Sequence, residues 1–432
     1  MAMLLGLASL LLKKEEEPSW ESSNDYNSYD SLGFSGQQRR ASTGDPFAIL
    51  KSRDPDFSLI LLEDFLFELY TRAIEARGNA DAMGRLRPYL SASVSDELQN
   101  RGGRKGFDVE GVVIGSLHTT KKQSGADYDY IRVTFESNHT EVYNGAPGTD
   151  ADDLRLGYYT KESWTLVRKR GISSRKPEAA RALNCPSCGA PVEDSSHDKC
   201  GYCGTVHGSA DFDWFVQKVV VESEETRGPT LTGYAEEVGT LDRTQIDKNR
   251  AKRLKELKVR DPDFSIEALR ERVHLIYEEL NSAWTSRAWE DARPYLSDRL
   301  WYSLRYWIDA YQAQGLQNVM LGAKSGKVQL VKLATDVHYD SVTLRVYAQA
   351  IDQTIHLGSG QVVGGSEKPR KYSEYWTLIR SNKRKGKPPP AKQCPNCAAP
   401  TAVNMAGNCD HCGVKISGGE FDWVLSKIEQ DE

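Results

Sequence analysis

Residues 260–265 of this 432-residue chain read Arg-Asp-Pro-Asp-Phe-Ser, and residues 53–58 read the same. Three further blocks recur in the same order. They are Arg-Pro-Tyr-Leu-Ser at 87–91 and 293–297, Trp-Thr-Leu-Val/Ile-Arg at 164–168 and 376–380, and Phe-Asp-Trp at 212–214 and 421–423. Self-similarity at one spacing indicates duplicated structural units. The chain is therefore predicted to be a tandem duplication, and one hydrophobic core rarely organises so many residues.

Each copy is predicted to begin with helices and to continue with strands. Ser265 can cap a helix whose apolar residues recur every three or four positions as far as Leu280. A second helix is expected between Ser297 and Gly315. Apolar residues then alternate, as in 342–346, which is typical of a strand. Helices followed by antiparallel strands predict an α+β fold, in which helices close one face of a curved sheet.

Eight cysteines form two quartets, and each quartet consists of two Cys-x-x-Cys pairs at the same separation. The first quartet is Cys185, Cys188, Cys200 and Cys203, and the second is Cys394, Cys397, Cys409 and Cys412. Two such pairs can hold four thiolates about 2.3 Å from a tetrahedral zinc ion, which leaves no open coordination position. We therefore predict two structural zinc ions, one in each ribbon, with iron as the alternative metal.

Other interpretations of the cysteine segments are weaker. A redox dithiol needs one exposed pair with a depressed pKa, whereas matched pairs recur here. His197, His207 and His411 lie near the cysteines, but four thiolates complete each site, so we expect surface histidines. Paired Cys-x-x-Cys motifs in a long chain indicate a reducing compartment. The folded part is therefore expected to face the cytosol.

The formal net charge of −5 gives no reason to expect a nucleic-acid protein. Basic residues nevertheless gather before each cysteine quartet. The candidates for contact with an anionic surface are Arg168, Lys169, Arg170, Arg175, Lys176, Arg380, Lys383, Arg384, Lys385 and Lys387. Two interpretations stay open, namely contact with anionic lipid or phosphate, or a solvated linker.

The expected organisation of the chain follows from these motifs. Residues 1–12 are apolar but fewer than the roughly 20 that span a bilayer. They are interpreted as a membrane-surface anchor or a truncated membrane segment, with a disordered apolar start as the alternative. The other expected divisions are a disordered tether at 13–52, a first domain at 53–172, a zinc ribbon with its Phe-Asp-Trp strand at 181–220, a charged linker and helix at 221–259, a second domain at 260–382, and a second ribbon with its strand at 390–432.

The second copy carries motifs that together resemble a known family. The Asp-Pro-Asp-Phe-Ser block is followed by an amphipathic helix, Trp284 and Trp289, the Arg-Pro-Tyr-Leu-Ser block and Glu-Tyr-Trp-Thr-Leu at 374–378. This order is similar to that of the Tim-forty-four-like domain, a family named for the mitochondrial inner-membrane import tether. The resemblance covers residues 53–170 and 260–381. It is closer in the second copy, because the first has Ala-Arg-Gly where the second has Trp284.

The resemblance implies two nuclear-transport-factor-two-like cones, each a curved antiparallel sheet closed by helices around an apolar pocket. It also implies a bacterial-type protein, because bacterial relatives often join such a domain to a membrane segment, a tether and a zinc ribbon. The implied partner is a membrane surface or a membrane protein complex, as for the mitochondrial tether. Fold alone does not fix activity.

The sequence contains no phosphate loop, nucleophile elbow or other catalytic signature. Asp56 and Asp263 stand beside helix starts, where a carboxylate stabilises the helix dipole. The predicted function is that of a non-enzymatic, membrane-peripheral adaptor at the cytoplasmic face, which binds lipid or a protein partner through its cones. Two alternatives stay open: a small-ligand binder or enzyme that uses the cone cavity, and a nucleic-acid-binding protein that uses the ribbons and basic linkers.

Overall fold

The structure is a computed structural model, and it describes residues 47–430 apart from several short gaps. The gaps are residues 102–106, 144–153, 181–182, 193–198, 227–230, 233–238, 387–391 and 405–406. The expected apolar segment at 1–12 and most of the expected tether at 13–52 therefore lie outside the described residues. The described chain forms two compact units that meet in sequence at residues 228 and 229. We call them the N-terminal unit and the C-terminal unit.

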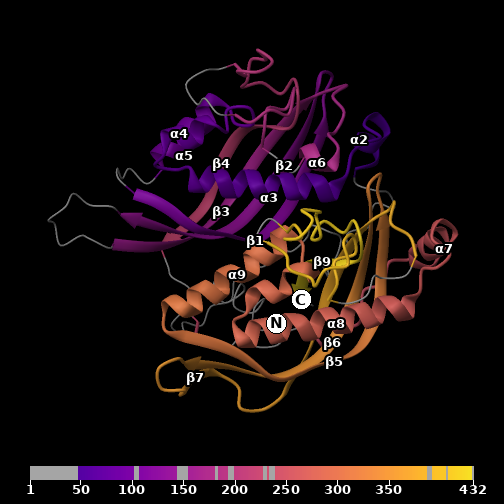
Figure 1. Ribbon diagram of the computed structural model, residues 1–432. Helices are drawn as coiled ribbons and strands as arrows, with labels where there is room; N and C mark the ends of the chain where they lie inside the picture. The colour runs from indigo at the N-terminus through magenta and orange to yellow at the C-terminus, as the bar shows by residue number, and fades with distance from the viewer. Residues whose placement is uncertain are drawn as a thin grey trace, which may run out of the picture. The chain divides into compact units, whose positions relative to one another are not determined.

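The N-terminal unit packs helices on one face of an antiparallel sheet whose strand order is β1-β2-β3-β4. Figure 1 shows α3 lying along this sheet. The core between them is apolar, and Leu66, Leu69 and Phe135 are at most 1 % exposed. The helices are α2 (Ala48–Arg53), α3 (Leu59–Glu75), α4 (Ala80–Gly84), α5 (Ala92–Asn100) and α6 (Pro177–Ala180), and the strands are β1 (Phe107–Ser124), β2 (Tyr128–Tyr143), β3 (Leu154–Lys169) and β4 (Phe215–Thr226).

The end of the expected tether is helical, which corrects that boundary. Helix α2 begins at Ala48, before the expected domain start at 53. Phe47 and Leu50 are buried in the apolar core of the N-terminal unit. Burial of two large apolar side chains offsets the entropy lost when this short segment becomes ordered.

The C-terminal unit also packs helices on an antiparallel sheet, with strand order β5-β6-β8-β9 and with β7 paired to β6. Its core is apolar and aromatic, as Val273, Ile276 and Trp376 are fully buried. The expected charged helix is present and ends at Arg260. The helices are α7 (Arg250–Arg260), α8 (Ile266–Ser286), the 3-10 helix η1 (Trp289–Tyr295) and α9 (Asp298–Ala313), and the strands are β5 (Leu316–Thr335), β6 (Tyr339–His356), β7 (Val362–Gly365), β8 (Arg370–Ser381) and β9 (Val424–Gln430).

Two of the repeated blocks end in a serine that caps a helix. These serines are Ser58, Ser91, Ser265 and Ser297. Each side-chain oxygen accepts a hydrogen bond from the backbone N–H three residues on, at 3.2 to 3.4 Å. The caps expected at Ser265 and Ser297 are confirmed, because a serine satisfies an N–H that the helix leaves unpaired. Asp56 and Asp263 are exposed, and the capping oxygen at both helix starts is the serine's.

In the sequence, each cysteine quartet lies between two strands that are neighbours in one sheet. In the N-terminal unit, β4 follows the quartet and pairs antiparallel with β3, and β9 pairs with β8 in the same way. The strand after Phe-Asp-Trp therefore belongs to the sheet and not to the ribbon, and each sheet extends past the domain ends expected at 172 and 382. Local periodicity does not reveal this pairing. Val216 and Leu425 are fully buried in the two main cores.

Candidate metal centres

Each cysteine quartet brings four sulfur atoms together, all within 4.8 Å of one another. In the first quartet the Sγ atoms of Cys185 and Cys203 are 3.8 Å apart, and those of Cys188 and Cys200 are 3.7 Å apart. The matching distances in the second quartet are 3.8 and 4.0 Å. Sulfurs about 2.3 Å from a tetrahedral ion lie about 3.8 Å apart, so the spacing fits zinc. A disulfide requires about 2.0 Å.

The backbone of each Cys-x-x-Cys pair folds into a tight knuckle. The Cys185 N–H donates to the Ala190 carbonyl at 2.9 Å, and the Gly189 N–H donates to the Cys185 carbonyl at 2.8 Å. The other three pairs repeat this pattern. The residue after the second cysteine of each pair has a positive φ, which glycine adopts without a steric penalty. These residues are Gly189, Gly204, Ala398 and Gly413.

Within each pair the first cysteine is buried and the second is exposed. The Thr205 hydroxyl lies 3.1 Å from the Cys203 sulfur and lowers the pKa of that thiol to about 6. The Asn396 side-chain amide does the same for Cys412, whose pKa is also about 6. The thiolate is the form that binds a metal. Four sulfur ligands leave no place for substrate, so such an ion is structural.

Asp54, in the first repeated block, connects the sheet to the chain segment that leads into the first ribbon. We call this arrangement the aspartate junction. Asp54 is 2 % exposed and accepts hydrogen bonds from Arg168 Nη2 at 2.7 Å and from the Ser174 hydroxyl and N–H at 2.7 and 3.1 Å. The Arg168 guanidinium lies 4.6 Å from the ring centroid of Trp214. The junction thus connects α2, β3, the ribbon segment and the start of β4.

The C-terminal unit has the same aspartate junction. Asp261 is 2 % exposed and accepts hydrogen bonds from Arg380 Nη2 at 2.8 Å and from the Gly386 N–H at 3.0 Å. The Arg380 guanidinium lies 4.6 Å from the ring centroid of Trp423. Buried charges are tolerated when they are paired and hydrogen-bonded. Three repeated blocks recur because their aspartate, arginine and tryptophan meet at this point.

Two of the basic residues that were expected to contact an anionic surface are placed in these junctions. Arg168 and Arg380 are 2 % and 3 % exposed, so they face the interior, which corrects the sequence analysis. The physical reason is their pairing with aspartates that precede them by more than a hundred residues. A run of basic letters does not reveal such a distant partner.

The remaining basic candidates differ in exposure. Lys169 and Arg175 form ion pairs with Asp211 and Asp213, at 2.9 and 2.6 Å. Arg170 and Arg384 are half-buried and donate to backbone carbonyls at 2.6 and 2.8 Å. Lys169 is exposed, as are Lys176, Lys383 and Lys385. Lys387 and the ribbon histidine His197 lie outside the described residues, whereas His207 and His411 are described and stand outside both sulfur groups.

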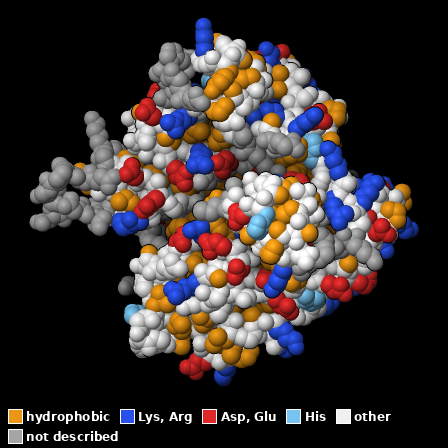
Figure 2. All heavy atoms as spheres, in the orientation of Figure 1, with side chains coloured by type: hydrophobic (Ala, Val, Ile, Leu, Met, Phe, Trp, Pro, Cys, Tyr) orange, Lys and Arg blue, Asp and Glu red, His pale blue; other side chains and the backbone are white. Residues whose placement is uncertain are grey.

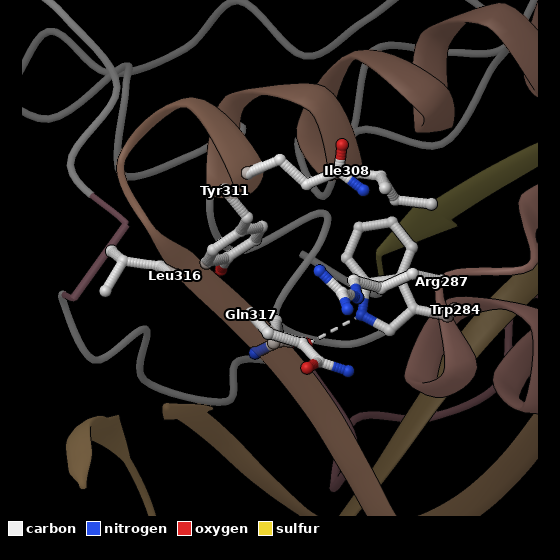
Figure 3. Close-up of a pocket in the computed structure, with 8 residues that line it drawn as sticks. Trp284, Arg287, Ile308, Tyr311, Leu316 and Gln317 are labelled. Atoms are coloured by element: carbon white, nitrogen blue, oxygen red, sulfur yellow. Dashed lines mark hydrogen bonds between the residues drawn. The ribbon is translucent and has the colours of Figure 1, made fainter. Parts of the chain in front are cut away.

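A shallow hollow in the C-terminal unit lies where α8 ends, beside α9 and the start of β5 (Figure 3). It measures about 200 Å³ and is lined by side chains that include Trp284, Tyr311 and Asn318. The Trp284 indole N–H donates to Asn318 Oδ1 at 2.8 Å. A second hollow, of about 340 Å³, lies beside the aspartate junction of the N-terminal unit.

Comparison with known proteins identifies one domain. Residues 250–389 match the model of the Tim44-like domain family, from the start of α7 to just past β8. No curated protein matches the chain. Among solved structures, an "Ntf2 like protein involved in plasmid conjugation" aligns with 86 % of this chain and 96 % of its own, at 9 % identity and a TM-score of 0.22, which is too low to establish a common fold. Within the described residues, no helix has the length and apolar character needed to cross a membrane.

Proposed function

We propose that the chain is a non-enzymatic adaptor built from two Tim44-like units, each with one structural zinc ion. The match of residues 250–389 to the Tim44-like domain carries this proposal, because that family is associated with membranes and membrane protein complexes. The N-terminal unit supports a tandem arrangement through the same order of helices and strands. The two aspartate junctions, built from the same repeated blocks, support it further.

We further propose that the adaptor attaches to an anionic membrane at the cytoplasmic face, through α7. Lys252, Lys255 and Lys258 are exposed on this helix, and Val259 is 81 % exposed. Figure 2 shows basic side chains gathered on the surface where Figure 1 draws α7. Each cation near an anionic leaflet contributes roughly 1 kcal/mol to attraction, and an exposed apolar side chain can enter the headgroup region.

The alternative of catalysis in the C-terminal unit has less support. The hollow beside Trp284 is small, and the tryptophan N–H that faces it is already bonded to Asn318. Nucleic-acid binding through the basic linkers also loses support, because two of the linker arginines are buried in the aspartate junctions. The alternative of ligand binding has more support in the N-terminal unit, because a cluster of charged and polar side chains is buried beside its apolar core.

Vesicle flotation tests the membrane proposal with the full zinc-loaded chain. We expect the protein to float with phosphatidylcholine vesicles that contain an anionic phospholipid, at low salt, and to stay unbound with phosphatidylcholine alone. Replacing Lys252, Lys255 and Lys258 by glutamate should weaken binding by about a hundredfold or more. The matched control places the same charge change on other exposed lysines, with Lys324, Lys368 and Lys371 replaced by glutamate.

Each outcome of this experiment decides one part of the proposal. If the wild-type chain does not float with anionic vesicles at low salt, membrane attachment is wrong and a protein partner becomes the remaining role. If both triple variants lose binding equally, net charge and not α7 controls attachment. Selective loss in the α7 variant supports the proposed surface.

A further inference from the structure

The interior of the N-terminal unit contains a cluster of buried ionisable side chains, which we call the polar interior. Its members are Arg77, Arg101, His139, Glu141 and Glu162. Arg77 Nη2 donates to Glu141 Oε1 at 2.7 Å, and Arg101 forms an ion pair with Glu162. Arg77 and His139 are 1 % exposed, and Glu162 is fully buried. The arginines follow α3 and α5, and the other residues lie on β2 and β3, so the cluster lies between helices and sheet.

The hydrogen bonds of the polar interior leave donors without acceptors. Arg77 Nη1 lies 3.0 Å from His139 Nε2, and a guanidinium only donates, so Nε2 accepts and the neutral ring carries its proton on Nδ1. Burial, together with the nearby charges of Arg77 and Arg101, lowers the pKa of His139 to about 3. Among the described residues, His139 Nδ1, Arg77 Nε and Arg101 Nη2 are buried without a hydrogen-bond partner.

The carboxylates of the cluster already accept hydrogen bonds. Glu141 accepts from Arg77, and Glu162 accepts from Arg101 and from the Trp164 indole N–H at 2.9 Å. Three nitrogen donors are therefore in surplus at a site that is closed to bulk water. A buried donor without an acceptor loses its hydration and regains nothing. The group that complements this surplus accepts hydrogen bonds and donates none.

The fold does not require the two arginines, because the C-terminal unit has apolar aromatic residues at the matching positions. Counted from the serine caps of α3 and α8, Arg77 corresponds to Trp284, and counted from the caps of α5 and α9, Arg101 corresponds to Trp307. Both tryptophans are buried. Buried ion pairs are often no more stabilising than well-packed apolar side chains of similar volume. Stability therefore does not account for the two buried arginines.

We propose that the polar interior of the N-terminal unit binds a small oxyanion, a carboxylate or a phosphate group. Its oxygens would accept hydrogen bonds from Arg77 Nε, Arg101 Nη2 and His139 Nδ1. A guanidinium matches the geometry of such anions, and charge-assisted hydrogen bonds are the strong ones. The Arg101 side chain is 8 % exposed at the end of α5 and marks where the cluster approaches the surface. This site is separate from the α7 surface.

The test follows the His139 ring by ¹H–¹⁵N NMR in the full zinc-loaded chain with labelled histidine, and His139→Gln assigns the signal. Inorganic phosphate and acetate are titrated separately against chloride at constant ionic strength and neutral pH. We expect a saturable shift of the Nδ1–H signal, with half-saturation on the order of 1 mM or below. A response to phosphate alone identifies a phosphate-bearing ligand, and a response to acetate alone identifies a carboxylate.

A variant of the arginine pair completes the test. Arg101→Met combined with Glu162→Gln removes one guanidinium without leaving a buried charge unpaired, and the amide oxygen that replaces the carboxylate remains an acceptor for Trp164. We expect the affinity to fall about tenfold or more, and Lys371→Met at the exposed surface to leave it unchanged. Unchanged affinity in the double variant overturns the proposal. If that variant does not fold, the wild-type titration still decides, because a signal unmoved by either anion also overturns it.

Discussion

The interiors of the two units differ, although both units contain the same buried set of a tyrosine, a glutamate and a tryptophan. Both keep a tyrosine on the first long helix and a Glu-x-Trp sequence on the strand that carries the Trp-Thr-Leu block. These residues are Tyr70, Glu162 and Trp164 in one unit, and Tyr277, Glu374 and Trp376 in the other. In each unit the indole N–H donates to the glutamate, at 2.9 and 2.8 Å. These shared residues belong to the common architecture, whereas the residues around them determine the chemistry of each interior.

The polar balance around this shared element is opposite in the two units. The N-terminal unit has donors in surplus, at Arg77, Arg101 and His139. The C-terminal unit has Trp284 and Trp307 in place of the arginines and Ala350 in place of the histidine. It also has a buried Asp352, whose Oδ2 has no hydrogen-bond partner among the described residues. Burial raises the pKa of Asp352. The two interiors therefore favour different ligands, and an anion suits the first and not the second.

The largest expected effect tests whether the two ribbons hold their sheets alike. Cys200→Ser or Cys409→Ser replaces a buried sulfur, and each should reduce the zinc content from two ions per chain to one. The ribbon and the strand that follows it should unfold locally, because metal binding supplies on the order of 10 kcal/mol to such segments. Elemental mass spectrometry counts the metal, and hydrogen exchange reports β4 and β9 separately. Iron in place of zinc, or full protection of the strand after zinc loss, contradicts this prediction.

The next effect compares the two aspartate junctions. Asp54→Ala and Asp261→Ala each leave a buried guanidinium unpaired, which should reduce the free energy of unfolding by about 3–5 kcal/mol. The loss should be larger for Asp54, because it accepts from two groups of Ser174, whereas Asp261 accepts from the single N–H of Gly386. Urea unfolding of the full chain, with hydrogen exchange to separate the units, measures both values.

The neighbouring aspartates of the same blocks provide matched controls for the junctions. Asp56 and Asp263 are exposed, so their replacement by alanine should change the free energy of unfolding by about 0.5 kcal/mol or less. If Asp56→Ala costs as much as Asp54→Ala, the block acts through the helix start and not through the buried arginine.

The sequence predicted the parts of this molecule that depend on local pattern. Helices before strands, the caps at Ser265 and Ser297, and the helix that ends at Arg260 are all confirmed, since caps and periodicity act over a few residues. The grouping of four cysteines in each ribbon is also confirmed, because the knuckle spacing dictates it. The zinc ions themselves stay a prediction.

The parts that the sequence analysis missed depend on partners far apart in the chain. The strand after Phe-Asp-Trp has its neighbour on the far side of the ribbon, so its place in the sheet follows from pairing and not from periodicity. In the sequence, Arg77 stands out only because the second copy has Trp284 at the matching position. Its partners His139 and Glu141 lie on β2, and α4, α5 and β1 separate that strand from α3 in the sequence. Alternation on β2 could have placed the two side chains on one face.

The smallest expected effect is a pH dependence that belongs to the N-terminal unit alone. The pKa of His139 is about 3 in the folded chain, against an ordinary value of 6.5, because of burial and the nearby Arg77 and Arg101. Between about pH 6.5 and pH 3, the unfolded chain therefore binds a proton at His139 that the folded chain does not bind. The resulting stability is fully present above pH 6.5 and is lost as the pH falls toward 3, by up to about 1.4 kcal/mol per pH unit.

Hydrogen exchange between about pH 7.5 and 5.5, corrected for intrinsic exchange rates, measures this slope in each unit. His139→Gln keeps an acceptor for Arg77 but does not titrate, so it should abolish the excess slope of the N-terminal unit. The C-terminal unit has Ala350 at the matching position and serves as the internal control. Equal slopes in wild type and His139→Gln would mean that other groups, such as the cysteine ligands, control the acid response, since both units share those ligands.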